Sequence, residues 1–284
     1  MIIVQVNGGL GNQLFQYSTA KALSIKKNAL LLLDMSWFDQ TGKKDGLHYF
    51  SIPDKITSNS ELKPFYERSL LTKAVQRLKP STKREIYREK FFHFDPDLFK
   101  VNDTVFLKGI WQSEKYFIDH EDALRQVLTI KEEYVGHLSS IKSELQSTNS
   151  ISIHVRRGDY LTAVALDVLG LQEKDYYKSA WSAIKSKVTN AQAYFFSDDT
   201  KYVEEELMPL IPGKILSRPE PDNYIEDFYL MSQCKHNIIA NSSFSWWAAW
   251  LNNNPDKWVV APKKWFNNGP KDTQDLIPHS WLRI

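Results

Sequence analysis

Residues 151–160 read ISIHVRRGDY, and this stretch decides the fold class of the chain. Its first half alternates β-branched and polar residues, a pattern typical of a short buried strand. The strand ends in two arginines and a glycine, and open α/β sheets bind ligands at the C-terminal edges of their strands. Arginine suits a phosphate group there because its planar fork donates two parallel hydrogen bonds. The same residues also fit a plain strand end with a surface ion pair between Arg157 and Asp159.

The composition of the 284-residue chain favours a globular protein of about two domains. Lys and Arg number 36 against 34 Asp and Glu, and a net charge of +2 gives no electrostatic case for a nucleic-acid partner. Cys234 is the only cysteine, which excludes an intrachain disulfide and indicates a reducing compartment. The first apolar run is too short for a signal peptide, and no window approaches the ~20 apolar residues that span a bilayer. We therefore expect a soluble, cytoplasmic protein.

A second candidate site begins the chain. Residues 2–6 (IIVQV) predict a buried strand, and residues 7–13 (NGGLGNQ) lead from it into a helix. Glycines allow close approach of a ligand to the backbone, and a helix start offers free N–H groups, so this is a candidate anion-binding element. The spacing fits neither the dinucleotide fingerprint nor the P-loop. A tight strand-to-helix turn with no ligand is the alternative interpretation.

Polar residues follow several later strands as well. Residues 110–117 (IWQSEKYF) suit sugar hydroxyls and ring faces, which makes Trp111 and Gln112 candidates for binding a sugar, although a helix start with core aromatics fits equally. Asp198 follows a strand and suits a base or ribose, or else a helix cap. Residues 241–243 (NSS) lie between a strand and a helix, so they predict a helix N-cap or a second phosphate site.

Two further stretches carry alternatives. Residues 63–90 are basic with a helical tendency, and we expect a solvated face there, with a face turned toward anionic lipid as the alternative. Asp95-Pro96-Asp97 matches a metal-binding D-x-D pattern, but its proline favours a rigid turn. Without a carboxylate cluster or a paired histidine motif, we expect no metal site. The polar run at residues 146–150 predicts a domain boundary there.

Taken together, three stretches closely resemble glycosyltransferase family 11, the α-1,2-fucosyltransferases. They are residues 8–17 (GGLGNQLFQY), 154–160 (HVRRGDY) and 241–247 (NSSFSWW), in this order. Residues 111–117 (WQSEKYF) and 196–199 (FSDD) are also similar to that family. The resemblance covers nearly the whole chain.

This resemblance implies an α/β fold of the GT-B type, in which two Rossmann-like domains face each other across a cleft. Residues 1–148 would form the acceptor-side domain, and residues 149–284 would bind GDP-fucose. The implied reaction is an inverting, metal-independent transfer of L-fucose from GDP-β-L-fucose to the 2-hydroxyl of a terminal galactose, in an oligosaccharide or a lipid-linked glycan such as an O-antigen. No cofactor is expected, since GDP-fucose is a substrate. The alternatives are a GT-B transferase for another nucleotide sugar and a non-catalytic carbohydrate-binding protein.

The resemblance also assigns roles to residues. Arg156 would grip the donor's β-phosphate and act in catalysis, while His154 and Asp198 would contact the guanosine. Asn12 would approach the phosphate or fucose from the other domain. The diphosphate would be held by the stretch that joins a strand to the helix after it, namely Asn241, Ser242, Ser243 and Phe244.

The general base does not carry over from the resemblance. In the related α-1,6-fucosyltransferases it is a glutamate shortly after the H-x-R-R-x-D motif, but residues 161–165 read LTAVA and hold no carboxylate. Asp159 and Glu114 are the remaining candidates. Eukaryotic relatives are membrane-anchored, and this chain shows no anchor. We therefore expect a bacterial, cytoplasmic member, with a peripheral contact at the inner face of the membrane as an alternative.

Overall fold

The computed structural model describes residues 1–218 and 224–284, which form two compact units. The first unit holds Met1–Thr129 and Asp272–Leu276, and the second holds Ile130–Lys271 and Ile277–Ile284. This division differs from the predicted boundary between residues 148 and 149. The polar run that suggested it joins helix α7 (Ser139–Ser147) to strand β6 (Asn149–Val155), and both belong to the second unit.

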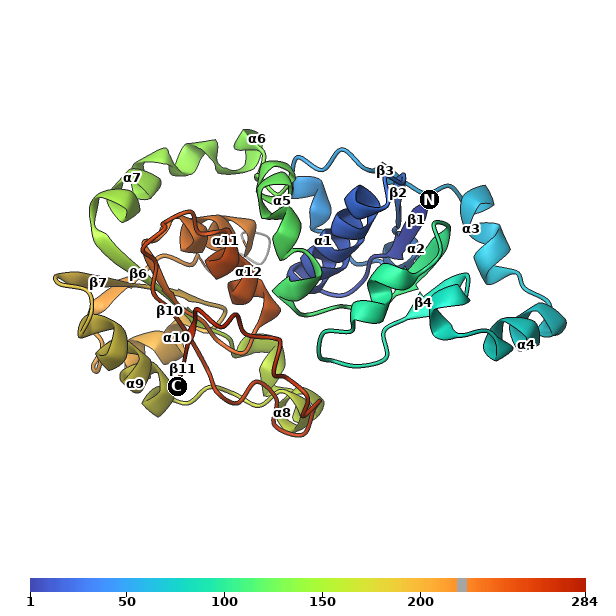
Figure 1. Ribbon diagram of the computed structural model, residues 1–284. Helices are drawn as coiled ribbons and strands as arrows, with labels where there is room; N and C mark the ends of the chain where they lie inside the picture. Colours follow the sequence, from blue (N-terminus) through green and yellow to red (C-terminus); the bar gives the residue numbers. More distant parts are fainter. Residues whose placement is uncertain (219–223) are drawn as a thin grey trace. The chain divides into compact units, whose positions relative to one another are not determined.

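The first unit is built on a parallel sheet with the strand order β3-β2-β1-β5-β4. Apolar runs form its strands and are buried at the centre, as expected for parallel strands covered on both faces. The bounds are β1 (Ile2–Gln5), β2 (Leu31–Asp34), β3 (Lys55–Ile56), β4 (Ile86–Arg88) and β5 (Val105–Lys108). Helix α1 (Leu10–Lys26) follows the glycine loop and packs against β1 and β2 (Figure 1).

The second unit is also built on a parallel sheet, with the order β11-β10-β9-β6-β7-β8. Strands β6 and β7 have seven residues each and pair along their whole length. The other bounds are β7 (Ala191–Ser197), β8 (Gly213–Ile215), β9 (His236–Ile238), β10 (Val259–Ala261) and β11 (Leu282–Arg283). In Figure 1, helices α11 and α12 lie side by side near this sheet.

Short helices complete both units. The first contains α2 (Ser36–Thr41), α3 (Asn59–Tyr66), α4 (Leu70–Leu78), α5 (Glu121–Val127) and the 3-10 turns η1 (Leu47–Tyr49), η2 (Ser81–Lys83), η3 (Pro96–Lys100), η4 (Glu114–Tyr116) and η5 (Ile118–His120). The second contains α6 (Glu132–Val135), η6 (Gly136–Leu138), α7, η7 (Gly158–Leu161), α8 (Ala163–Val168), α9 (Lys174–Lys185), α10 (Thr200–Tyr202), η8 (Val203–Leu207), α11 (Tyr224–Gln233) and α12 (Ser243–Leu251). Between residues 118 and 147 the chain forms several short helices, and the boundary between the units follows Thr129.

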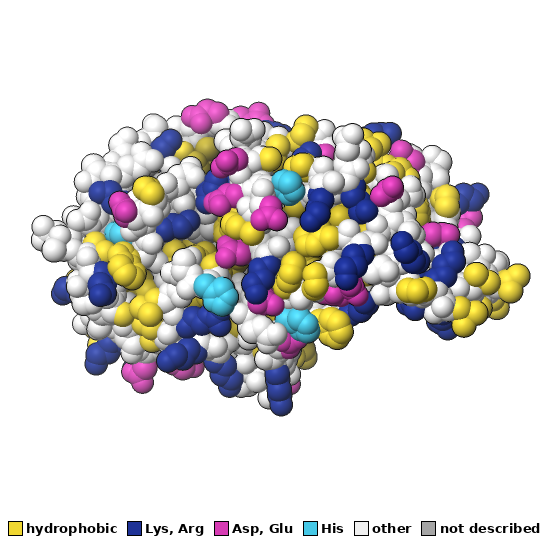
Figure 2. All heavy atoms as spheres, viewed as in Figure 1, with side chains coloured by type: hydrophobic (Ala, Val, Ile, Leu, Met, Phe, Trp, Pro, Cys, Tyr) yellow, Lys and Arg dark blue, Asp and Glu magenta, His cyan; other side chains and the backbone are white. Residues whose placement is uncertain are grey.

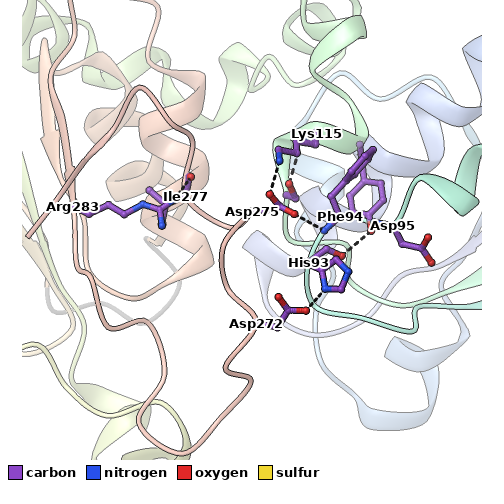
Figure 3. Close-up of polar contacts among 10 residues, drawn as sticks. His93, Phe94, Asp95, Lys115, Asp272, Asp275, Ile277 and Arg283 are labelled. Atoms are coloured by element: carbon purple, nitrogen blue, oxygen red, sulfur yellow. Dashed lines mark hydrogen bonds and ion pairs between the residues drawn. The ribbon is translucent and has the colours of Figure 1, made fainter.

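The C-terminal segment Asp272–Leu276 returns to the first unit (Figure 3). Asp272 pairs with His93, and Asp275 pairs with Lys115. Asp275 also accepts a hydrogen bond of 3.0 Å from the backbone N–H of Phe94. A segment close to the end of the chain is therefore part of the unit that begins it.

Strand order places one reversal point in each sheet. In the first sheet β2 and β3 follow β1 on one side, and β5 and β4 lie on its other side. The direction in which strands are added therefore reverses between β1 and β5. In the second sheet it lies between β6 and β9. Ligands of doubly wound sheets bind outside the strand ends at such points. The glycine loop follows β1, and the arginine motif follows β6, so both sequence candidates lie at these positions.

Side-chain amides of α1 hold the glycine loop in place. Gln16 is fully buried; its Oε1 accepts from the N–H of Asn7 at 2.9 Å, and its Nε2 donates to the carbonyl of Gly109 at 3.1 Å. Gln13 donates to the carbonyl of Gly8 at 2.9 Å. Gly8 has a φ of 77°, a left-handed conformation that favours glycine. Gln16 thus ties the loop after β1 to the loop after β5.

We expect Gln16→Leu to lower the free energy of unfolding by about 1–3 kcal/mol, because it leaves the partly buried N–H of Asn7 and the partly buried carbonyl of Gly109 without this partner. Urea unfolding of the purified protein measures the change. Gln40→Leu is the matched control, since Gln40 is exposed on α2, and it should change the value by less than about 0.5 kcal/mol. Equal effects of the two substitutions would contradict a structural role for Gln16.

Candidate active site

Arg156 follows β6 and is held between two carboxylates. Its Nη2 lies 2.7 Å from Oδ1 of Asp159, and its Nη1 lies 2.7 Å from Oδ2 of Asp198. Val155 of β6 pairs with Ser197 of β7, so the next residue of each strand meets its neighbour at the sheet edge. The Arg156 side chain is 33% exposed. A guanidinium carries five N–H donors, so an anion can bind to those that the two ion pairs leave free.

Arg157 turns away from this position. Its Nε lies 3.1 Å from Oδ2 of Asp199, and its guanidinium stacks on the ring of Tyr202, 3.7 Å from the ring centroid. The interpretation that paired Arg157 with Asp159 is wrong, because η7 brings Asp159 back toward Arg156, three residues before it. Only one of the two adjacent arginines is therefore presented at the strand end.

Gly158 is required by the close approach of Asp198. A Cβ atom at this position would lie 2.7 Å from Oδ2 of Asp198. The other oxygen of that carboxylate accepts a hydrogen bond of 2.9 Å from the N–H of Arg157. Asp198 thus binds both the backbone after β6 and the guanidinium of Arg156. The sequence assigned it to guanosine or to a helix cap; Asp199, not Asp198, caps the next helix.

His154 is buried on β6 beside an aromatic cluster. Its Nδ1 has no hydrogen-bond partner among the described residues, and burial, with the nearby Arg156 charge, lowers the pKa of the imidazole well below its ordinary value. The ring is therefore neutral at physiological pH. Phe244 lies 5.7 Å from it, centroid to centroid, and also contacts Tyr224 and Phe228. A neutral, buried imidazole thus lies beside the ring of Phe244.

The stretch after β9 completes the second unit's site. Asn241 uses Nδ2 internally, donating to the carbonyls of Leu169 at 2.9 Å and Trp265 at 3.0 Å, while its buried Oδ1 has no partner among the described residues. Ser242 is the N-cap residue of α12, and Ser243 is its first residue. The helix N-terminus therefore opens at the same reversal point as β6.

Tyr160 links the two halves of this site, and the sequence did not single it out for a role. Its hydroxyl donates to the carbonyl of Asn241 at 3.2 Å and is hydrogen-bonded to Ser242. Its ring lies 5.6 Å from the guanidinium carbon of Arg156. Tyr160 thus connects the cation after β6 with the start of α12.

Asp227 supports the end of β7 through a hydrogen bond with Ser217. Ser217 donates its hydroxyl hydrogen to the Asp227 carboxylate, and Ser217 Oγ accepts from the N–H of Ser197 at 2.8 Å. Burial, followed by the nearby Glu226 and Asp198 carboxylates, raises the pKa of Asp227 to about 7, although the Ser217 bond opposes the shift. No sequence pattern marked this residue.

The remaining candidates lie in the first unit. Gln112 donates to Oδ1 of Asn12 at 2.8 Å, so these two predicted residues do meet, at the β1 and β5 reversal point. Trp111 is 1% exposed and belongs to the core, which offers no support for a sugar contact by its ring. Glu114 begins η4.

Glu89 stabilises the left-handed backbone conformation of Trp111. The partly buried Glu89 carboxylate accepts from the N–H groups of Ile110 at 2.7 Å and Trp111 at 2.9 Å. Trp111 has a φ of 58°, which a non-glycine residue adopts only with such support. Sequence reasoning missed Glu89, because its partners are distant in the chain.

The Asp95-Pro96-Asp97 stretch forms the predicted rigid turn. Asp95 caps η3 by accepting from the N–H of Asp97 at 3.0 Å, and it also accepts from the hydroxyl of Tyr87 at 2.8 Å. Lys90 lies within 3.7 Å of Asp95 and 3.6 Å of Asp97. Throughout residues 1–218 and 224–284, no three His, Cys, Asp or Glu side chains gather as a metal site.

The whole chain, residues 1–284, matches the family described as Glycosyl transferase family 11. The α-1,2-colitosyltransferase of Escherichia coli is 32% identical over 296 residues, covering 100% of this chain and 99% of its own. The O-antigen biosynthesis glycosyltransferase WbnK of Escherichia coli is 32% identical over 305 residues, covering 98% and 99%. Galactoside α-(1,2)-fucosyltransferase 1 of Bos taurus is 23% identical over 262 residues, covering 87% and 65%.

Solved structures give the same fold. FUT1 of Arabidopsis thaliana, determined as a mutant in complex with GDP, aligns with a TM-score of 0.57 at 13% identity, covering 99% of this chain and 75% of its own. NodZ α-1,6-fucosyltransferase soaked with GDP-fucose aligns with a TM-score of 0.53 at 14% identity, covering 88% and 92%. The two parallel α/β units are thus those of a GT-B glycosyltransferase. Within that class, the chain belongs to glycosyltransferase family 11.

Among the described residues no helix has the length and apolar character needed to cross a bilayer.

We expect Asp227 to make the protein less stable as pH rises toward 7. A carboxyl pKa raised from 3.8 to about 7 means that the folded state binds more protons than the unfolded state between these values. The free energy of unfolding then falls as pH increases through this window, by up to the order of 4 kcal/mol. Unfolding of the wild type and Asp227→Asn, followed by urea between about pH 5 and pH 8, should give a shallower pH dependence for the variant. Parallel profiles would contradict the shift.

Proposed function

We propose that this family 11 glycosyltransferase transfers L-fucose from GDP-β-L-fucose to the 2-hydroxyl of a terminal galactose, with inversion and without a metal ion. The observation that carries the proposal is the meeting of Arg156, the unpartnered His154 nitrogen and the α12 N-terminus at one reversal point. The α-(1,2) linkage in the names of two relatives, one fucosyl and one colitosyl, supports the regiochemistry.

In this proposal the donor lies at the end of β6. The diphosphate meets Arg156 and the backbone N–H groups at the start of α12, where Ser242, Ser243 and Phe244 lie, because helix N-termini favour anions. The guanosine lies against Phe244, with His154 Nδ1 and Asp198 as hydrogen-bonding groups. Asn241 shapes this loop through its internal bonds, and Asn12 is the first unit's contribution to the donor.

The chemistry requires a fixed cation beside the leaving group. The galactose hydroxyl attacks C1 of fucose from the face opposite the diphosphate, the C1–O bond breaks, and GDP leaves with the bonding electron pair. Negative charge on the β-phosphate is then larger in the transition state than in the ground state, so Arg156 lowers the barrier more than it tightens donor binding. The two carboxylates that flank Arg156 orient it before the donor binds.

The hydroxyl proton must pass to a base. Asp159 and Glu114 remain the proposed candidates, and Asp159 is 66% exposed while paired with Arg156.

On the acceptor side, Gln112 is held by Asn12 and is the proposed contact for galactose hydroxyls. A galactose-terminated oligosaccharide or lipid-linked glycan is the proposed acceptor, and the O-antigen role in the name of one relative supports this class. We propose a cytoplasmic location, with contact at the inner face of the membrane.

A second donor has a specific observation in its favour. The α-1,2-colitosyltransferase matches the whole chain at 32% identity, so a nucleotide-linked colitose is the competing donor. Assaying GDP-fucose and GDP-colitose against a panel of galactosides, with product linkage analysis, decides between them. Thermal shifts with GDP, UDP and free galactosides separate both from a carbohydrate-binding protein, which would respond to sugar and not to GDP.

We expect Arg156→Lys to lower kcat by roughly 10²-fold or more, because lysine keeps the charge but loses the two-pronged fork. The KM for GDP-fucose should change much less, and circular dichroism should be unchanged. Arg157→Lys is the control, since Arg157 contacts Asp199 and Tyr202. Normal turnover by Arg156→Lys together with loss in Arg157→Lys would reverse the two assignments, and normal turnover by both would remove the phosphate site from this strand end.

We expect activity to survive EDTA, because the leaving-group charge falls on Arg156 and the α12 N-terminus. Initial rates with and without the chelator, on protein dialysed beforehand, measure this. Complete loss that Mg²⁺ or Mn²⁺ restores would show that the reaction needs a metal ion.

A further inference from the structure

Helix α4 carries its apolar side chains on the outside of the first unit. Leu70 is 84% exposed, Leu71 75% and Leu78 87%, and Val75 is also exposed. At 100° per residue these side chains and Ala74 fall within one continuous face of the helix. The sequence predicted a solvated, charged surface for this region. The structure instead turns an apolar face toward solvent.

The opposite face of α4 attaches the helix to the fold by polar contacts. Gln76 is buried and donates to Oε1 of Glu85 at 2.7 Å, and its Oε1 accepts from the N–H of Glu85 at 3.2 Å. Arg68 donates to the other oxygen of Glu85, also at 2.7 Å. A surface helix of a globular protein normally buries its apolar face. In α4 the buried side chain is that of Gln76, and the apolar face is left exposed to solvent.

Exposed cations lie along one side of this apolar face and just after the helix. Lys73 and Arg77 lie on α4, and Lys79 and Lys83 follow it. Within the part of the chain that the structure describes, none of the four forms an ion pair with a carboxylate, since Glu85 is paired with Arg68 and Glu67 with Lys63. Figure 2 shows side chains of both kinds, apolar and basic, gathered where Figure 1 places α4.

We infer that α4 docks this protein on an anionic membrane surface. The apolar face enters the boundary between headgroups and acyl chains, and Lys73, Arg77, Lys79 and Lys83 contact lipid phosphates. Charge complementarity favours this occupant over a second copy of the chain. A two-fold interface through α4 would bring the same cations of both copies together, whereas an anionic bilayer neutralises them.

The inferred binding is reversible and independent of the reaction. Nine residues with one apolar face bury little area, so the attachment is weak without the added attraction of the charges. It needs neither the donor nor the acceptor, and its test uses neither. The inference therefore stands or falls separately from the proposed reaction, and it assigns the proposed membrane contact to α4.

Co-sedimentation of the full chain with vesicles tests the inference. The wild type should bind vesicles of phosphatidylglycerol and phosphatidylcholine and release them at high salt. Leu70→Gln/Leu78→Gln should lower the partition coefficient at least about tenfold, because two exposed leucines no longer enter the apolar layer. Lys73→Gln/Arg77→Gln should lower it by about twentyfold on the anionic vesicles and leave binding to phosphatidylcholine alone unchanged.

The matched control is Leu30→Gln/Leu210→Gln, which removes two exposed leucines, one from each unit, that lie outside α4. It should bind like the wild type. Absence of wild-type binding, or equal binding by all variants, overturns the inference. So does a dimer in sedimentation velocity that Leu70→Gln/Leu78→Gln converts to monomer, because α4 would then be an interface between copies.

Discussion

Parallel pairing of every strand constrains where polar chemistry can lie in this protein. Both sheets pair in parallel throughout the described residues, and their central strands are buried on both faces. Polar side chains therefore cannot line the middle of these strands without losing hydrogen bonds to water. Ser152 and Asn237, in the middle of β6 and β9, replace such bonds by bonding to each other. The polar residues of the candidate site lie where strands end and helices begin, and strand order brings two such ends together in each unit. The positions of Arg156, Asp198 and Ser242 follow from this constraint.

The ion pairs around Arg156 show how that edge is organised. Its partners come from the loop after its own strand and from the neighbouring strand, and Tyr160 connects it to the loop after β9. Three segments thus fix one guanidinium. Asp227 and Ser217 hold the end of β7 in turn, so the geometry around Arg156 is supported by residues that contact no candidate ligand.

Strands and the parallel fold class were predictable, and so was the position of the candidate site residues at strand ends, because apolar runs and the polar residues after them are local in sequence. The supporting residues were not. Gln16 and Glu89 stabilise loops through partners far away in the chain, and no periodicity marks them. The residues around Trp111 in the sequence suggested that its ring contacts a sugar, but the structure buries this ring in the core. The predicted domain boundary differs from the observed one because a polar run can join a helix to a strand inside one unit as readily as it can separate two units.

The return of Asp272–Leu276 to the first unit has a consequence for synthesis of the chain. Domains generally fold in order as they leave the ribosome, the N-terminal one first. Here Asp272 and Asp275, the partners of His93 and Lys115, are translated after almost the entire second unit. The first unit can form its sheet early, but it acquires these contacts only after residues 130–271 of the second unit have been translated. The first unit can therefore be complete only after most of the second unit has been synthesised.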